Sequence, residues 1–253
     1  HSTTSPSMSP SMSVNMTNMT NVTWANATSV SYNKSDACAV VSGIELTAAL
    51  TNVSCASVEV HGIISVTDSV MVQRSVRLIG VTTDAAIIQS NSNKNCLYIR
   101  DVTTGVFVTG LRLDASNAQA ALVVANASNV YVSSVHIDGP PHIFAVFYAG
   151  ADVAAHEATL SNYASRTGMD TNNTLVNSTV NSTWSGDSLS FSLQNLGSLN
   201  YNRVINGGKI AYYMNANSTC IGNVVESSIS QGIFLSTPSF GNTIMYNQLL
   251  NTL

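Results

Sequence analysis

The chain has 253 residues, a formal net charge of −4 and only 9% charged residues, against roughly a quarter in an ordinary soluble domain. Its nine Lys and Arg residues are scattered and form no basic patch for nucleic acid, and no apolar run is long enough to span a membrane. It contains 36 Ser, 24 Thr and 27 Asn, yet 45% of it is apolar. We therefore expect a folded, neutral chain that has no nucleic-acid partner and no membrane span.

Residues 1–35 differ in composition from the rest and predict an extended, low-complexity arm. The first 33 residues contain no Asp, Glu, Lys or Arg, and such a segment cannot bury enough surface to fold alone. Apolar residues recur along it at extended-chain spacing, so the arm has one apolar side. We expect that side to be held on its own domain or on a neighbouring subunit. The predicted assembly residues are Met8, Met12, Val14, Met16, Met19, Val22 and Trp24.

The acceptor pattern for N-linked glycans, Asn-x-Ser/Thr, occurs eleven times. All five Asn residues among the first 33 positions belong to such sequons. The chain begins at His1 without a signal-like leader, so we expect a secreted or cell-surface protein whose leader has been removed. The predicted glycosylation sites are Asn15, Asn18, Asn21, Asn26, Asn33, Asn52, Asn126, Asn172, Asn177, Asn181 and Asn217.

Four cysteines allow three pairings if all are oxidised. Cys38 and Cys55 bracket one short segment and are the preferred disulfide. Cys96 and Cys220 either form a second disulfide or are buried free thiols. Their spacing does not suggest zinc, and we expect no metal site built on cysteine.

Residues 36–55 predict a short cap for the domain that follows. Ser42 and Glu45 have the spacing of a capping box, in which the side chain of each residue accepts a hydrogen bond from a backbone N–H near the other. The mostly apolar stretch after them predicts a helix of about ten residues that ends near Asn52.

From Ser57 onward, short segments alternate apolar and polar residues with a period of two, as β-strands do. These segments recur about every 20 residues, which is typical of a coil of parallel strands. Asn residues recur at matching points, so we expect stacked Asn side chains to hydrogen-bond along the coil. The aligned starting points are Ser57 with Ser75, Gly105 with Asn129, and Asn202 with Asn223 and Asn242.

The stretch SVEVHGIISVTDSVMVQRSVRLIG, preceded by a short cap helix, resembles the opening of right-handed parallel β-helix proteins of the pectin-lyase-like group. NRVINGGKIAYYM and NVVESSISQGIFL resemble their later coils, so the resemblance covers about residues 40–253. It implies an all-β, right-handed parallel β-helix over residues 36–253. At this repeat length the coil would have about 8–9 turns. Residues 157–188 interrupt the pattern and predict a long glycosylated loop that carries Trp184.

One cluster of outward side chains is a candidate site. If Leu111 and Leu113 point inward, their neighbours Arg112 and Asp114 point outward. One repeat later, His136 and Asp138 do the same and should lie beside them. Two carboxylates about 5 Å apart would suit Ca²⁺ or an acid/base pair. Pectin-lyase-like enzymes place their sites on such an outer face. The alternative is an ordinary solvated column opposite a core face, and we expect no other cofactor.

Other residues are weaker candidates. His142, His156 and Glu157 would be acid/base groups, but each is more typical of a loop residue. A mature amino-terminal His1 chelates copper in some enzymes, but it has no second His nearby in sequence. The outward aromatics would be either a sugar-stacking platform or a ladder that stabilises stacked strands; they are Tyr98, Phe107 and Tyr131.

The sequence favours a structural subunit of a secreted, heavily glycosylated fibre or surface coat. The chain stops within a repeat, which would leave strand edges open to another chain. An open edge and a free arm together predict head-to-tail assembly of copies into a homopolymer. The alternative is a polysaccharide lyase, epimerase or sugar-binding β-helix. Whether the chain is an enzyme is left open, with absence of the commonest active-site motifs of this fold favouring a non-enzyme.

Overall fold

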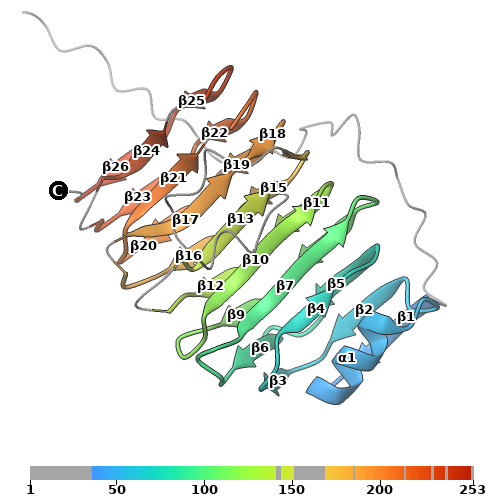
Figure 1. Ribbon diagram of the computed structural model, residues 1–253. Coiled ribbons are helices and arrows are strands. Elements are labelled where there is room, and N and C mark those ends of the chain that lie inside the picture. The colour runs from blue at the N-terminus through green and yellow to red at the C-terminus, as the bar shows by residue number, and fades with distance from the viewer. Residues whose placement is uncertain are drawn as a thin grey trace, which may run out of the picture. The chain divides into compact units, whose positions relative to one another are not determined.

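The computed structural model is a parallel β-helix whose chain winds through three sheets in turn (Figure 1). It describes residues 36–140, 144–150, 169–184, 186–213, 215–228, 231–236 and 239–251. Each strand pairs in parallel with its counterparts on neighbouring turns, as β8, β11 and β15 do. The predicted all-β parallel β-helix is thereby confirmed, with about eight turns. The predicted arm, residues 1–35, lies outside the described residues.

The three sheets are named here in the order in which the chain visits them. Sheet 1 contains β1 (Ala37–Val40), β2 (Ser57–Val60), β5 (Val76–Gly80), β8 (Val106–Thr109), β11 (Val130–Ser133), β15 (Thr174–Val176), β19 (Ser198–Asn200), β22 (Thr219–Ile221) and β25 (Thr243–Met245). Sheet 2 contains β3 (Ile63–Val66), β6 (Ala86–Gln89), β9 (Arg112–Asp114), β12 (His136–Asp138), β16 (Thr179–Asn181), β20 (Arg203–Ile205), β23 (Val224–Glu226) and β26 (Gln248–Leu250). Sheet 3 contains β4 (Val70–Val72), β7 (Asn95–Val102), β10 (Ala120–Ala127), β13 (Val146–Gly150), β17 (Asp187–Ser192), β21 (Lys209–Tyr213) and β24 (Ile233–Ser236). A small fourth sheet pairs β14 (Asp170–Thr171) with β18 (Gln194–Asn195).

The core fills the inside of the coil because alternate residues of each short strand point inward. Matching inward residues of successive turns lie one above another and form columns. In sheet 2 the column is Ile64, Ile87, Leu113, Ile137, Val180, Val204, Val225 and Leu249. All of its members except the last are at most 1% exposed. Burying each such side chain contributes about 1.5–3 kcal/mol.

Helix α1 (Gly43–Thr51) covers the first end of the coil, as the capping-box pattern predicts (Figure 1). The Ser42 hydroxyl accepts from the backbone N–H of Glu45, and the Glu45 carboxylate accepts from that of Val41 at 2.8 Å. The inner face of the helix is buried on the core through Leu46, Ala49 and Leu50. In the part of the chain that the structure describes, no helix is long and apolar enough to cross a membrane.

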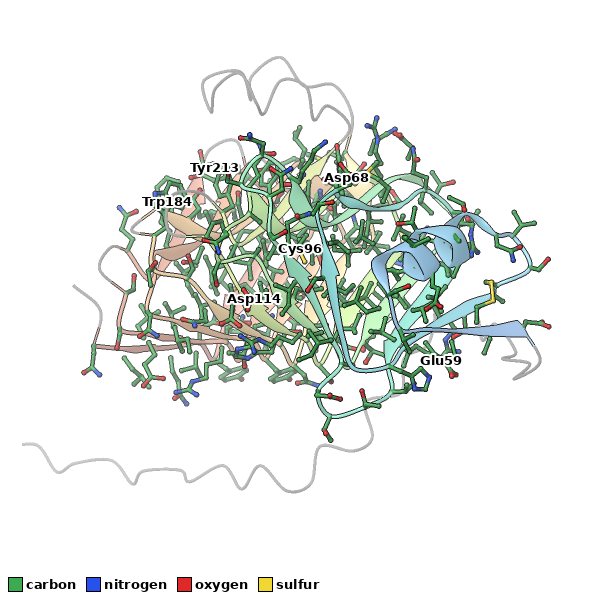
Figure 2. The ribbon with its side chains drawn as sticks, turned by 90° about the horizontal axis from the view of Figure 1, so that it is seen from below. Glu59, Asp68, Cys96, Asp114, Trp184 and Tyr213 are labelled. Carbon is green, nitrogen blue, oxygen red and sulfur yellow. A yellow bond between two sulfur atoms is a disulfide. The ribbon has the colours of Figure 1, made fainter. Side chains whose placement is uncertain are left out.

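The preferred disulfide between Cys38 and Cys55 is present and ties β1 to the segment after α1 (Figure 2). Cys96 and Cys220 are free thiols, each with its side chain buried inside the coil. Of the two alternatives for these cysteines, the free thiols are confirmed. They lie on different sheets, since Cys96 is on β7 and Cys220 on β22.

Two ladders of buried amide side chains run along the corners between sheets, as predicted from the recurring Asn residues. At the corner between sheets 1 and 2, the Oδ1 atoms of Asn202, Asn223 and Asn247 each accept a hydrogen bond from a backbone N–H of the preceding turn. The second ladder, at the corner between sheets 3 and 1, contains Asn173, Gln194 and Asn215. These bonds satisfy buried backbone groups that the corners would otherwise leave unpaired.

The predicted register is correct in the middle of the coil and wrong at two places. Val106 pairs with Val130 as expected. Ser57 lies beside Arg77 rather than Ser75, so that turn is longer than the alignment indicated. Asn223 stacks on Asn247 and not on Asn242. In both places, the core fixes the pairing of the strands. The connection between them has a different number of residues from the one that the alignment assumed.

The predicted loop over 157–188 is wrong for its second half. Residues from Asp170 onward form β14, β15 and β16, a full turn whose inward Leu175 and Val180 are buried. Trp184 is half-buried, and its ring meets that of Phe144 edge-on at 5.4 Å. The many polar residues of this segment suggested a loop, but several of them, such as the buried Asn173, lie at the corners between strands. Residues 157–168 lie outside the described part of the chain.

Candidate functional site

The predicted cluster forms on the outer face of sheet 2. Arg112 and Asp114 lie on β9, and His136 and Asp138 occupy the same positions on β12, so each residue faces its expected partner. The alternation places Leu113 and Ile137 inward between them, both fully buried. The sequence therefore predicts this juxtaposition correctly.

Arg112 joins the two carboxylates in one ion network. Its Nε donates to Asp138 Oδ2 at 2.9 Å, and its Nη2 donates to Asp114 Oδ2 at 3.1 Å. Asp114 Oδ1 also accepts from the backbone N–H and the hydroxyl of Ser116. His136 Nε2 lies 3.4 Å from Asp138 Oδ1. The guanidinium, half exposed, lies against both acids and balances part of their charge.

Asp138 is the most enclosed acid of this network, with a side chain 13% exposed. Burial opposes ionisation of its carboxyl. Hydrogen bonds from Asn181, at 3.0 Å, and from Arg112, together with nearby positive charge, outweigh burial and hold the pKa of Asp138 below its ordinary value. The carboxylate is therefore ionised at neutral pH and engaged by three neighbouring side chains. A general acid needs the opposite, a raised pKa.

Two shallow hollows flank the network. One, of about 390 Å³, has a lining that includes Asp84, Ala86, Ile88, Arg112 and His136. The other, of about 270 Å³, is lined by Ser116, Asp138, Gly139, Asn181, Ser182 and Thr183. Within the described residues, no group of three or more His, Cys, Asp or Glu side chains is placed to hold a metal ion. The network thus offers an exposed imidazole and paired charges on a nearly flat sheet face.

The three outward aromatics do not form one platform. Phe107 and Tyr131 are neighbours on sheet 1, with ring centroids 5.9 Å apart and planes inclined by 48°. Arg77 lies over the Phe107 ring. Tyr98 lies on β7 in sheet 3, where it packs beside a separate apolar cluster. The alternation rule gave the outward direction of each ring, but the sheet to which each strand belongs depends on turn length.

The described sequons differ in exposure. Asn52, Asn126, Asn172, Asn177 and Asn217 are exposed, whereas Asn181 is half-buried. The remaining predicted residues lie outside the described part of the chain: the candidates His1, His142, His156 and Glu157, the sequons Asn15, Asn18, Asn21, Asn26 and Asn33, and the seven assembly residues of the arm.

Two buried carboxylates were missed by the sequence analysis. Asp170, 4% exposed, has a buried Oδ2 without a hydrogen-bond partner among the described residues, and burial raises the pKa of this carboxyl to about 6. Asp187, also 4% exposed, lies on sheet 3 beside Lys209 and Tyr213. Both follow segments without clear alternation, and the only sequence signal was an isolated acid in a chain with few charges.

No protein-family model matches the chain, and no curated protein matches it. Among solved structures, the chain is similar to an alginate lyase from Paenibacillus sp. str. FPU-7, with a TM-score of 0.45 and 10% sequence identity. The match covers 84% of this chain and 99% of the lyase. At this identity the likeness carries no information about activity.

Proposed function

We propose that this chain is a structural subunit of a secreted, N-glycosylated extracellular fibre or surface coat, and that copies assemble through the last turn of the coil. One observation carries the proposal. The inward columns are buried along the coil, but their last members are open: Leu235 is 47% exposed, Ile244 39% and Leu249 49%. These side chains have the direction and chemistry of core residues, and another turn of chain would bury them.

The open turn also lacks the usual protection against strand addition. Natural edge strands are commonly protected by charged side chains. Here no Asp, Glu, Lys or Arg follows Glu226 in the sequence, so β24, β25 and β26 carry none. Further apolar side chains are exposed around this turn, including Phe240, Met245 and Tyr246. Among the described strands, β24, β25 and β26 are each the last of their sheet, so an incoming strand would meet sheet edges and apolar contacts without charge repulsion.

The occupant that we propose is the arm, residues 1–35, of a neighbouring copy. The opposite end of the coil is covered by α1, so the coil of one copy cannot simply continue into that of the next. The arm has no Asp, Glu, Lys or Arg before Lys34, like the turn that it would cover. It is longer than the 21 residues that separate Asn202 from Asn223 on successive turns. Extended segments commonly add to open sheet edges in this way.

The sequons support an extracellular setting. Five described ones are exposed and available to a glycan: Asn52, Asn126, Asn172, Asn177 and Asn217. Glycans would hydrate a surface that has few charges, because 9% charged residues leave the outer faces dependent on neutral polar groups. The disulfide between Cys38 and Cys55 suits the same oxidising compartment.

The test compares the full chain with a chain that lacks residues 1–35. We expect the full chain to form filaments or large oligomers by electron microscopy and light scattering, and the truncated chain to stay monomeric with the same circular dichroism. Ile244→Asp should also prevent assembly, whereas Ile63→Asp, an exposed apolar residue near the other end, should not. A full chain that is monomeric at high concentration would overturn the proposal.

The polysaccharide-active alternative is tested separately. The full chain is incubated with uronate polymers, with and without Ca²⁺, and product formation is followed. We expect none, because Arg112 already engages both Asp114 and Asp138. Turnover that disappears in Asp114→Ala or Asp138→Ala would replace the structural proposal with an enzymatic one.

A further inference from the structure

Asp187 and Lys209 face each other on adjacent turns of sheet 3. They are directly paired residues of the parallel strands β17 and β21. The residues before them, Gly186 and Gly208, bring the two backbones unusually close, since a Cβ on Gly208 would lie 1.3 Å from the Gly186 carbonyl oxygen. That oxygen accepts from the backbone N–H of Lys209 at 3.0 Å. The backbone pairing therefore fixes the Cα positions of Asp187 and Lys209 relative to each other.

The two charged groups meet in an enclosed position. Lys209 Nζ lies 3.3 Å from Asp187 Oδ1, with side chains only 17% and 5% exposed. The Tyr213 hydroxyl donates to Asp187 Oδ2 at 2.6 Å. Lys209 Nζ also lies 4.8 Å from the centre of the Phe234 ring, which shields it. Tyr213, on β21, is labelled in Figure 2. For comparison, the side chains of the pair Lys94 and Asp68 are 43% and 86% exposed.

Enclosure makes the charged pair costly to maintain. Moving an ammonium and a carboxylate out of water costs several kcal/mol per ion, and their attraction offsets this cost only in part. Burial raises the pKa of Asp187 above its ordinary value, although Tyr213 and Lys209 oppose the shift. A proton passed from Nζ to Oδ1 would leave a neutral amine beside a neutral carboxylic acid. Such a pair, held in contact and away from water, has the components of an amide bond.

We propose that Lys209 and Asp187 condense to an intramolecular isopeptide bond that links adjacent turns of the coil. The Nζ lone pair attacks Asp187 Cγ, and the C–Oδ1 bond breaks. Two of the three ammonium protons leave with Oδ1 as water, and the third stays on the amide nitrogen. No oxidant or other reactant is required. The Tyr213 hydroxyl stabilises the negative charge that develops on Oδ2, as hydrogen-bond donors do in acyl transfer.

The bond would act independently of the proposed assembly, because it lies within one chain. It would close a loop between two turns near the open end of the coil, and a covalent loop restricts the unfolded chain. A covalent link would also replace an ion pair that strong acid or high salt weakens.

The experiment is an intact-mass measurement on the folded full chain made in a bacterial host without N-glycosylation, with the disulfide reduced. We expect the mass to fall short of the sequence mass by one water. Proteolysis should yield a branched peptide that joins the segments of Asp187 and Lys209. Asp187→Asn should lose ammonia in place of water and reach the same final mass as the unsubstituted protein.

Lys209→Arg is the matched control, because it keeps the positive charge but cannot form this bond, and it should show its full sequence mass. Lys94→Arg, in the exposed pair, should leave the water loss unchanged. The full sequence mass in a protein shown by circular dichroism to be folded would overturn the proposal. So would a water loss that persists in Lys209→Arg, or one that peptide mapping places elsewhere.

Discussion

Asn223 Oδ1 accepts two hydrogen bonds from Asn202 on the preceding turn, one from its backbone N–H at 2.9 Å and one from its Nδ2 at 3.1 Å. Asn223 Nδ2 in turn donates to the carbonyl oxygen of Leu199 at 2.7 Å. Both Asn side chains are buried. One amide therefore satisfies a donor and an acceptor of the backbone that water cannot reach.

Replacing that amide should be costly. Asn223→Ala leaves the buried Asn202 N–H and the Leu199 carbonyl without this partner, and each such group costs about 1–3 kcal/mol. We expect the free energy of unfolding in urea to fall by about 2–4 kcal/mol. Asn93→Ala, in an exposed turn, is the control and should change it by less than about 0.5 kcal/mol. Equal losses in the two variants would contradict a specific role for the ladder.

Asp170 should make stability depend on pH between its ordinary pKa of 3.8 and its folded-state pKa of about 6. Its folded-state pKa of about 6 lies above the ordinary value of 3.8 because the carboxyl is buried. The stability that its protonated form contributes is fully present below the unfolded pKa and is lost as the pH rises through about 6. Asp170→Asn should therefore raise the free energy of unfolding at pH 8, by something on the order of 2–3 kcal/mol, and leave it nearly unchanged at pH 4.

The measurement is urea unfolding at the two pH values. Asp84→Asn, at an exposed position, serves as the control and should give the same small change at both. If Asp170→Asn destabilises the protein at pH 8, burial does not oppose ionisation of this carboxyl as the structure indicates.

The two free thiols should be unreactive in the folded protein. Burial raises the pKa of Cys220 to about 11 and that of Cys96 further still. Since the thiolate is the reactive form, alkylation at pH 8 should be very slow in native protein. Unfolding without a reductant should expose two thiols, and adding a reductant should expose four. Rapid native labelling of either cysteine would show that its turn opens readily.

Glycan occupancy should differ between sequons in protein secreted from a eukaryotic host. Asn126, Asn177 and Asn217 are exposed, and we expect them to carry glycans. Asn181 is half-buried, its Nδ2 donates to Asp138, and its Oδ1 accepts from Asn206, so we expect it to be largely unmodified. Glycopeptide mass spectrometry measures each site. High occupancy at Asn181 would mean that this side chain is modified before the Asp138 network forms.

Much of the fold follows from local sequence pattern. Period-two alternation gave the inward and outward sides of the strands, and it placed Arg112 beside His136 correctly. The capping box gave α1, because its hydrogen bonds are local. Turn length has no local signal, so the register was wrong wherever a corner gained or lost residues, as between Asn223 and Asn247.

The surplus of Asn had a second cause that the sequence did not reveal. Many corner residues adopt a left-handed backbone with positive φ, which Asn tolerates better than other side chains larger than Gly. Asn126, Asn172, Asn177 and Asn217 are in this conformation, with φ between 47° and 58°. The same four positions are sequons. Part of the pattern that predicted glycans is thus also required by the shape of the corners.

In the ladder between sheets 1 and 2, hydrogen-bonded residues of neighbouring turns are mostly 21 or 24 positions apart in the sequence. Val135 and Ser178, which are also hydrogen-bonded, are 43 positions apart. The backbone N–H of Val135 still donates to the Ser178 hydroxyl, and Ile137 still lies beside Val180. This turn is therefore longer than its neighbours by nearly the length of a whole turn, and its inner contacts with them are preserved. In such a coil, one turn can thus carry many more residues than its neighbours while the inner scaffold stays the same.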